Sequence, residues 1–376
     1  MHLRGTFVGV GLLFFATAFC AHAQELTPDT VVTMKAVVIE VLSESTETIQ
    51  GTDVEHTLQT IRAQIETGPE AGAIITIEND FLELSVGDRF YLNRTTSTFD
   101  GSDYYSPVEK VRTPALLALG LLFIAVVIIF GGKQGIRGLV ALVASFFFIG
   151  AMLIPGIMQG YSPVAVSIGV ASLIVLIGSY VTHGVNRTTS AAVIGMIVTI
   201  GITGLLAYIS IGFTSLTGWT GDEVTYLNLN TRGAIDLAGL LLGGILIGLL
   251  GVLYDAAIGQ AVSVEELARA GSQYSRRDVY LRALRIGREH VGALVNTLAI
   301  AYAGASLPLL LLFFGSGEID IGLTLNRELF ATEIVRILVG SIGLVLAVPI
   351  TTAVAVYMLF GRILPHVSTG HTHGVQ

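Results

Sequence analysis

The chain has 376 residues, of which 52% are hydrophobic and only 13% are charged, and its mean hydropathy is +0.75. Globular proteins in water carry about 25% charged residues, so this composition excludes a soluble protein with a solvated surface over the whole chain. Glycine is abundant, at 44 residues, which suits membrane helices that pack closely through small side chains. The composition therefore predicts an integral membrane protein.

Residues 1–23 have the features of a secretory signal peptide. Arg4 supplies a positive charge, residues 7–19 form an apolar run, and Ala21–Ala23 fits the small-x-small cleavage rule. An uncleaved anchor helix is the alternative, and either reading exports the segment that follows. The only cysteine, Cys20, lies inside this region, so no disulfide is expected in the mature protein.

Residues 24–112 are predicted to form an exported, β-rich domain. Turn signals separate short runs rich in β-branched residues, and these runs are Val32–Val41, Thr57–Ile65, Ala73–Ile77 and Asp88–Leu92. About five short strands predict a small OB-like barrel or a sandwich. Acidic residues outnumber basic ones, and no stripe of basic and aromatic side chains is present, so a nucleic-acid partner is not expected. The domain is interpreted as a structural or protein-docking module.

Residues 113–362 are predicted to form the membrane domain. Seven apolar runs are long enough to cross about 30 Å of hydrocarbon: Ala115–Gly132, Leu139–Met158, Pro163–His183, Ala191–Phe213, Ile235–Ile258, Val291–Phe314 and Ile334–Phe360. Pro349 in the last run predicts a kink or a tilt. The predicted fold class is an α-helical polytopic membrane protein of about seven transmembrane helices with a small N-terminal all-β, OB-like extracytoplasmic domain.

The distribution of basic residues predicts the orientation of the spans. With the β-rich domain outside, the inner segments hold Lys133, Arg137, Arg187, Arg269, Arg276, Arg277, Arg282, Arg285, Arg288 and Arg362. The loops between spans on the other side hold only Arg232 and Arg327. The positive-inside rule requires this asymmetry. We therefore expect the N-terminal domain outside and the C-terminus in the cytoplasm.

The segment 263–290, between the fifth and sixth spans, is predicted to be an amphipathic cytoplasmic helical segment. Ser263 with Glu266, and Ser275 with Asp278, match the capping-box pattern, so a helix is predicted to begin at each serine. Three basic residues then recur every third position beside apolar ones: Arg282, Arg285 and Arg288. This pattern is typical of a helix that lies on the inner leaflet of a membrane.

Polar side chains cluster near the inner ends of the fifth and sixth spans. Asp255 and Gln260 belong to the fifth span region, and His290, Asn296 and Thr297 belong to the sixth. One loop joins the two spans, so these groups lie at similar depth, where polar side chains are costly and usually functional. We interpret them as a candidate site that binds a cation or polar solute, or relays a proton. Alternatively, they lie at the water interface or bond a neighbouring helix.

Other ionisable residues near the span ends are interpreted as structural. Asp236 and His183 are expected at the membrane interface. Two local ion pairs are predicted from their helical spacing, and they are Glu265 with Arg269 and Glu333 with Arg336.

The C-terminal tail, residues 363–376, contains three of the eight histidines. His-rich tracts bind metal in some proteins, but three ligands in a tail make a poor site, so a solvated cytoplasmic tail is expected. The chain lacks a phosphate-binding Gly-rich loop with Lys, a GxSxG motif and an HExxH motif. Neither a cofactor nor an enzymatic activity is expected. The only residues that suggest an intramembrane enzyme are Asp255 and His290.

Two segments resemble the YibE/F family of bacterial multipass membrane proteins. They are GVLYDAAIGQAVSVEEL, Gly251–Leu267, and HVGALVNTLAIAYAGASLPLL, His290–Leu310. With the order of signal, β-rich domain and spans, the resemblance extends over about residues 31–362. It implies a location in the bacterial inner membrane, but it brings no activity and no site residues.

Two functions remain open from the sequence. The first is a transporter or permease for a small polar or ionic solute, with the polar cluster as its site. The second is an envelope scaffold or accessory subunit whose exported domain docks a partner. The lipid bilayer is the expected environment, and a homo-oligomer or a companion membrane subunit is compatible with both functions.

Overall fold

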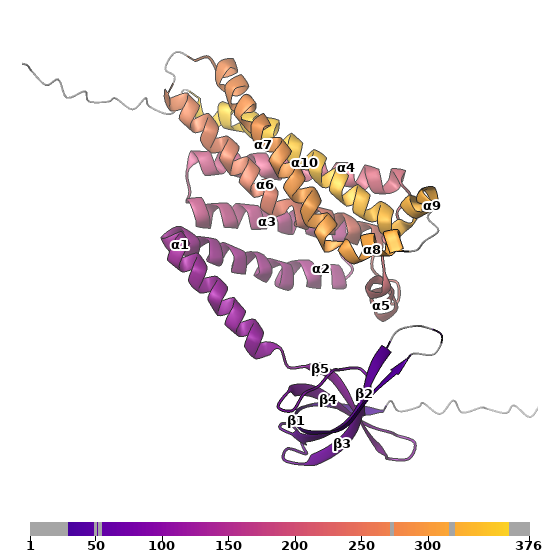
Figure 1. Ribbon diagram of the computed structural model, residues 1–376. Coiled ribbons are helices and arrows are strands. Elements are labelled where there is room, and N and C mark those ends of the chain that lie inside the picture. The colour runs from indigo at the N-terminus through magenta and orange to yellow at the C-terminus, as the bar shows by residue number, and fades with distance from the viewer. Residues whose placement is uncertain (1–28, 49–50, 52–54, 271–273, 316–319, 361–376) are drawn as a thin grey trace, which may run out of the picture. The chain divides into compact units, whose positions relative to one another are not determined.

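The structure, a computed structural model, describes residues 29–48, 51, 55–270, 274–315 and 320–360 (Figure 1). The predicted signal peptide and the histidine-containing tail lie outside these residues. The chain divides into two compact units, Met1–Leu122 and Phe123–Gln376.

The N-terminal unit contains one antiparallel sheet of five strands in the order β3-β2-β1-β4-β5 (Figure 1). The strands are β1 (Thr30–Thr48), β2 (Glu55–Ile65), β3 (Ile74–Asn79), β4 (Arg89–Thr96) and β5 (Asp103–Lys110). The pairing of β1 with β2 shifts register at two places, and such bulges bend a strand. The edge strands β3 and β5 also contact each other. The sheet is therefore a half-barrel, which confirms a β-rich domain but does not confirm an OB-like fold.

Alternation of side chains along the strands builds the core of this unit. Successive residues of a strand point to opposite faces, and the inward positions carry Met34, Ala36, Val38, Ile61, Ala63, Ile65, Phe90 and Leu92, all buried. This alternation was visible in the sequence only for part of each strand, because β1 and β4 extend several residues beyond the predicted runs.

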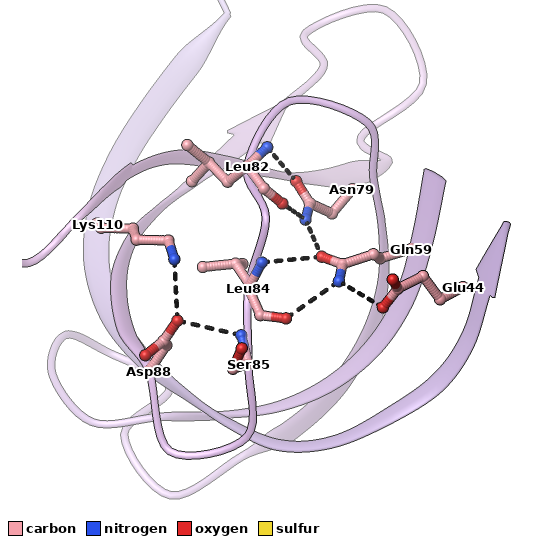
Figure 2. A network of polar contacts seen from close by, with 8 residues as sticks. All are labelled: Glu44, Gln59, Asn79, Leu82, Leu84, Ser85, Asp88 and Lys110. Atoms are coloured by element: carbon pink, nitrogen blue, oxygen red, sulfur yellow. Dashed lines mark hydrogen bonds and ion pairs between the residues drawn. The ribbon is translucent and has the colours of Figure 1, made fainter. Parts of the chain in front are cut away.

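A buried amide network holds the segment between β3 and β4 (Figure 2). Gln59 lies at its centre, where its Oε1 accepts hydrogen bonds from Leu84 N and Asn79 Nδ2, both at 2.9 Å. Its Nε2 donates to Leu84 O and to Glu44 Oε2, both at 3.1 Å. Asn79 Oδ1 accepts from Leu82 N at 2.9 Å. The backbone of this segment therefore finds its partners in side chains rather than in a further strand.

The side chain of Asp88 forms hydrogen bonds at the end of the same segment (Figure 2). Its Oδ2 accepts from Ser85 N at 3.1 Å and from Lys110 Nζ at 3.0 Å. These bonds favour the charged carboxylate, so the Ser85 amide first, and then Lys110, lower the pKa of Asp88 below its ordinary value of 3.8.

Acidification is expected to remove the contribution of Asp88 to stability. A carboxyl whose pKa is lower in the folded state stabilises the fold above its unfolded pKa, and this contribution disappears as the pH falls through the folded pKa. The N-terminal unit should therefore lose stability below about pH 4. Hydrogen exchange of residues 80–88 between pH 6 and pH 3 measures the loss. Asp88→Asn should flatten that pH dependence, and an unchanged slope would contradict this role.

The C-terminal unit is helical, and four long helices form its packed centre (Figure 1). They are α3 (Pro163–His183), α4 (Arg187–Phe213), α6 (Leu237–Ala270) and α10 (Glu328–Leu359). α10 packs against α4, α6 and α7 (Arg276–Ala305), and α6 also packs against α3. α10 continues through Pro349. The remaining helices are α1 (Thr113–Phe148), which begins in the N-terminal unit, η1 (Ile149–Leu153), α2 (Ile154–Met158), α5 (Asp222–Asn230), α8 (Leu307–Gly315) and α9 (Ile321–Asn326).

Within the described residues, five helical stretches are long and apolar enough to cross a membrane, so the predicted count of seven is not confirmed. The first stretch, Thr113–Met158, contains a break at Gly132, where φ is +52° and ψ is −137°. The first two predicted spans lie on either side of this glycine. The sixth predicted span is divided between α7 and α8, which meet at Ser306.

The two predicted helix starts have opposite outcomes. Ser275 and Asp278 form a reciprocal capping box at the start of α7, as predicted. The predicted start at Ser263 is wrong, because α6 continues without interruption to Ala270. Ser263 Oγ instead donates to Gly259 O at 2.8 Å, a local bond available to serine inside a helix. Burial of neighbouring residues such as Val264 keeps this part of the chain helical.

Glycine lets α4 and α10 approach closely. A Cβ atom at Gly195 would lie 2.9 Å from Thr351 Cα, and a Cβ atom at Gly343 would lie 2.3 Å from Thr203 Oγ1. Each helix therefore presents a glycine to a buried threonine of the other. Small residues at a crossing are the packing device expected of membrane helices.

A carboxylate at the start of α10 binds the loop that follows α4. Glu328 Oε1 accepts hydrogen bonds from Thr217 N and Gly218 N, both at 2.6 Å, and from Trp219 N at 3.2 Å. Gly218 has a φ of +85°, and a Cβ there would lie 2.3 Å from Leu237 O. The loop therefore requires glycine at this position and joins the starts of α6 and α10.

Candidate functional site

α6 and α7, together with Val348 of α10, line a cavity of about 340 Å³. The α6 wall is lined at positions four residues apart, by Asp255, Gly259 and Ser263, which share one helix face. The α7 wall is lined by Gly287 and His290, three residues apart. Two helices whose other positions are mostly apolar thus place a carboxylate, a hydroxyl and an imidazole around one space, which we call the α6–α7 cavity.

Gln260 also lines this cavity and links its two main walls, α6 and α7, by a hydrogen bond. Its side chain is 4% exposed, and its Nε2 donates to Ala283 O of α7 at 2.7 Å. Its Oε1 lies so close to Gly287 that a Cβ atom there would be 2.6 Å away. The amide therefore bridges the helices, and Gly287 provides the room for this bridge.

Asp255 and His290 both line the cavity and are exposed. No ion pair joins them in the part of the chain that the structure describes. Both side chains can therefore interact with a bound solute. A carboxylate accepts hydrogen bonds and attracts cations, whereas an imidazole accepts or donates a proton.

Asn296 and Thr297 do not line the α6–α7 cavity. Both are exposed on α7, and Thr297 Oγ1 donates to Ala293 O of its own helix at 2.9 Å. The structure thus brings together three of the five predicted site residues, Asp255, Gln260 and His290. It places the other two further along α7, away from the polar wall.

A second, larger cavity of about 460 Å³ lies at the junction of α3, α4, α6 and α10. Its lining includes His183, Arg187, Glu265 and Arg269. Glu265 accepts a hydrogen bond from Thr188 Oγ1 at 2.5 Å and forms the predicted ion pair with Arg269. The sequence did not predict this group, because its members belong to three helices. The only available signal was that charged residues occur at the ends of three predicted spans on one side.

Three other ionisable residues near the helix ends, Asp236, Glu333 and Arg336, have local partners. Asp236 Oδ1 accepts from Gly239 N at 3.0 Å and so caps the start of α6. The predicted pair of Glu333 and Arg336 is confirmed, with Oε1 and Nη1 3.3 Å apart. Among the described residues, no group of three or more His, Cys, Asp or Glu side chains is arranged to hold a metal ion.

Comparison with known proteins identifies the family of the helical part. The family model described as YibE/F-like protein matches residues 119–361, which include both walls of the α6–α7 cavity but not the β-rich unit. No curated protein and no solved structure matches the chain. The match covers more than half of the chain, and several apolar helices accompany it. The chain is a membrane protein that belongs to the YibE/F-like family.

Proposed function

We propose that the helical unit is a transporter or permease for a small polar or ionic solute, and that the α6–α7 cavity is its solute site. The observation that carries the proposal is the convergence of Asp255, Gln260 and His290 on one cavity of about 340 Å³. Ionisable side chains of a membrane-spanning helix such as α6 are rare and are usually functional. Their position on a cavity that α7 also lines supports a role in binding.

In this proposal Gln260 has a structural role, whereas Asp255 and His290 interact with the solute. Gln260 is held by Ala283 O and sets the distance between α6 and α7. Asp255 of α6 and His290 of α7 line the cavity and would bind the solute or exchange a proton with it.

We place the protein in the bacterial plasma membrane, with the β-rich unit outside and the C-terminus in the cytoplasm. The proposal rests on the bias of arginine and lysine described above. In this orientation the α6–α7 cavity lies toward the cytoplasm, because the basic start of α7 and the end of α6 flank it. The cavity would form an inward-facing solute site.

A ligand screen of the purified full-length protein tests the proposed site. A solute that binds only the folded state raises its stability by about 2.7 kcal/mol at a hundredfold excess over its Kd. Thermal unfolding in detergent is measured against ions and small polar metabolites. We expect a stabilising solute whose effect is lost in Asp255→Asn.

Glu266→Gln is the matched control for this screen. It also removes one carboxylate from α6, but Glu266 is exposed and lines neither polar cavity. The control should keep the response of the wild-type protein. An equal response of Asp255→Asn and Glu266→Gln would reject the α6–α7 cavity as the site.

An envelope scaffold is the second candidate function, and one feature of the β-rich unit favours it. Phe99, in the turn between β4 and β5, is 98% exposed, and Phe81 is 72% exposed. Exposed aromatic side chains are typical contact points for a protein partner. A Phe99→Ser, Phe81→Ser double variant should lose cross-links to such a partner while keeping solute binding. Loss of solute binding as well would contradict separate roles for the two units.

A further inference from the structure

The two ionisable side chains of the α6–α7 cavity lie at nearly the same level of their helices. A short connection makes α6 and α7 antiparallel neighbours, and the hydrogen bond from Gln260 to Ala283 O sets their register. On α6, Asp255 lies five positions before this bond, or about 7.5 Å. On α7, His290 lies seven positions after it, or about 10.5 Å. The two side chains are therefore level to within about 3 Å and line the same part of the cavity.

The hydrogen-bonding capacity of these two side chains calls for a solute that donates. The carboxylate of Asp255 only accepts hydrogen bonds, and the imidazole of His290 accepts one in its neutral form. Ser263 lies eight positions beyond Asp255 on α6, or about 12 Å, so it marks the other end of the cavity. Its hydroxyl donates to Gly259 O at 2.8 Å and retains its lone pairs as acceptors.

The charge of the cavity wall is negative. Among the described residues, Asp255 is the only carboxylate that lines this cavity, and no arginine or lysine lines it. Arg285 and Arg288 of α7 each stand two positions from a lining residue of that helix, so they do not share its face. Arg269, near the end of α6, is paired with Glu265 beside the larger cavity. Asp255 therefore attracts a cation into the cavity and repels an anion.

The rest of the lining favours an organic cation over a metal ion. No group of three His, Cys, Asp or Glu side chains in the described part of the chain is arranged to hold a metal. Much of the remaining wall is aliphatic and comes from Ala256, Leu294 and Val348. Such a wall supplies no ligand to a metal ion, whereas it can contact the hydrocarbon part of an organic cation.

The volume of the cavity sets the size of this cation. An apolar cavity of about 150 Å³ binds benzene, and the α6–α7 cavity measures about 340 Å³, so it has room for about ten non-hydrogen atoms. We propose that the solute is a small primary ammonium ion with a short aliphatic body, an inference that rests on the solute site proposed above. Its ammonium group donates hydrogen bonds to Asp255 and His290, and its body lies along Gly259 toward Ser263.

Saturation-transfer NMR with 3-methylbutylammonium as the probe tests this inference. The full-length protein is placed in nanodiscs of deuterated phosphatidylcholine, and transfer to the methyl protons of the probe is compared with that from empty nanodiscs. We expect transfer in the wild-type protein. 3-Methylbutanamide and 3-methylbutanoate have the same carbon skeleton with a neutral and an anionic head group. Each should bind at least tenfold more weakly than the ammonium ion.

Asp255→Asn tests the contact with the head group and should weaken binding of the probe at least tenfold. Glu266→Gln removes an exposed carboxylate from the same helix outside the cavity and should keep wild-type binding.

Gly259→Leu tests the contact with the aliphatic body. Gly259 lines the cavity, and no atom lies within 4 Å of a Cβ atom built there, so leucine occupies the cavity without a steric clash at its Cβ. Binding should again fall at least tenfold. Gly251→Leu is the matched control, because Gly251 has the same open surroundings on α6 but does not line the cavity. Helical circular dichroism confirms that each variant is folded.

The outcomes separate this inference from the wider proposal of a solute site. Absence of transfer in the wild-type protein, equal binding of the three head groups, or unchanged binding in Asp255→Asn would overturn the ammonium ion as the solute. If the thermal screen then found a solute of another class whose effect requires Asp255, the α6–α7 cavity would remain a solute site. If no solute of any class required Asp255, both proposals would fail.

Discussion

Gly195→Leu is expected to destabilise the helical unit strongly. A Cβ atom at this position would lie 2.5 Å from Thr351 Oγ1 and 2.9 Å from Thr351 Cα. Rotation of a side chain cannot relieve the second contact, because it involves the backbone of α10. We expect a loss of about 3 kcal/mol or more. The melting temperature and the monodisperse fraction of the full-length protein in detergent measure this effect.

The same substitution six residues later is the control. Gly201 also lies in α4, but it is exposed and no atom lies within 4 Å of a Cβ atom built there. Gly201→Leu should leave the melting temperature within a few degrees of the wild-type value. If the two variants were equally stable, the close α4–α10 crossing would be wrong.

The second large effect is expected in the β-rich unit. Gln59→Leu keeps the size of the side chain but removes the bonds to Leu84 N, Leu84 O and Asn79 Nδ2. A buried group left without a partner costs about 1–3 kcal/mol, so a loss of about 3 kcal/mol or more is expected for the three together. Hydrogen exchange of residues 80–88 in the full-length protein should become faster.

Gln64→Leu provides the comparison for this change, because Gln64 is an exposed glutamine on the same strand. Its effect on exchange should be small. Slow exchange of residues 80–88 in Gln59→Leu would show that the amide network does not hold this segment. The two variants together separate the network from the general effect of a glutamine-to-leucine change on β2.

Local patterns in the sequence predicted local structure well. The capping box at Ser275 depends on residues within four positions of one another, and the structure contains it. The same holds for the ion pairs of Glu265 with Arg269 and of Glu333 with Arg336. The pattern at Ser263 failed for a physical reason: helix continuation buries residues such as Val264, and tertiary burial outweighs a weak local signal for a helix start.

The candidate site was predictable only in part. Asp255, Gln260 and His290 could be grouped because one connection joins their helices, so their depths follow from the helix rise. The exposure of Asn296 could not be predicted, because it depends on how α7 rotates about its own axis when it packs. The bridge from Gln260 to Ala283 O and the need for Gly287 beside it depend on the same rotation.

Solute flux into proteoliposomes tests most directly the claim that the α6–α7 cavity is the solute site of a transporter. The wild-type protein, Asp255→Asn and Glu266→Gln are reconstituted at equal density, and uptake of the solute identified by thermal stabilisation is followed. We predict uptake by the wild-type protein and Glu266→Gln, with at least a tenfold lower rate for Asp255→Asn. Equal uptake by all three would contradict the site, and no uptake above that of empty liposomes would contradict transport itself.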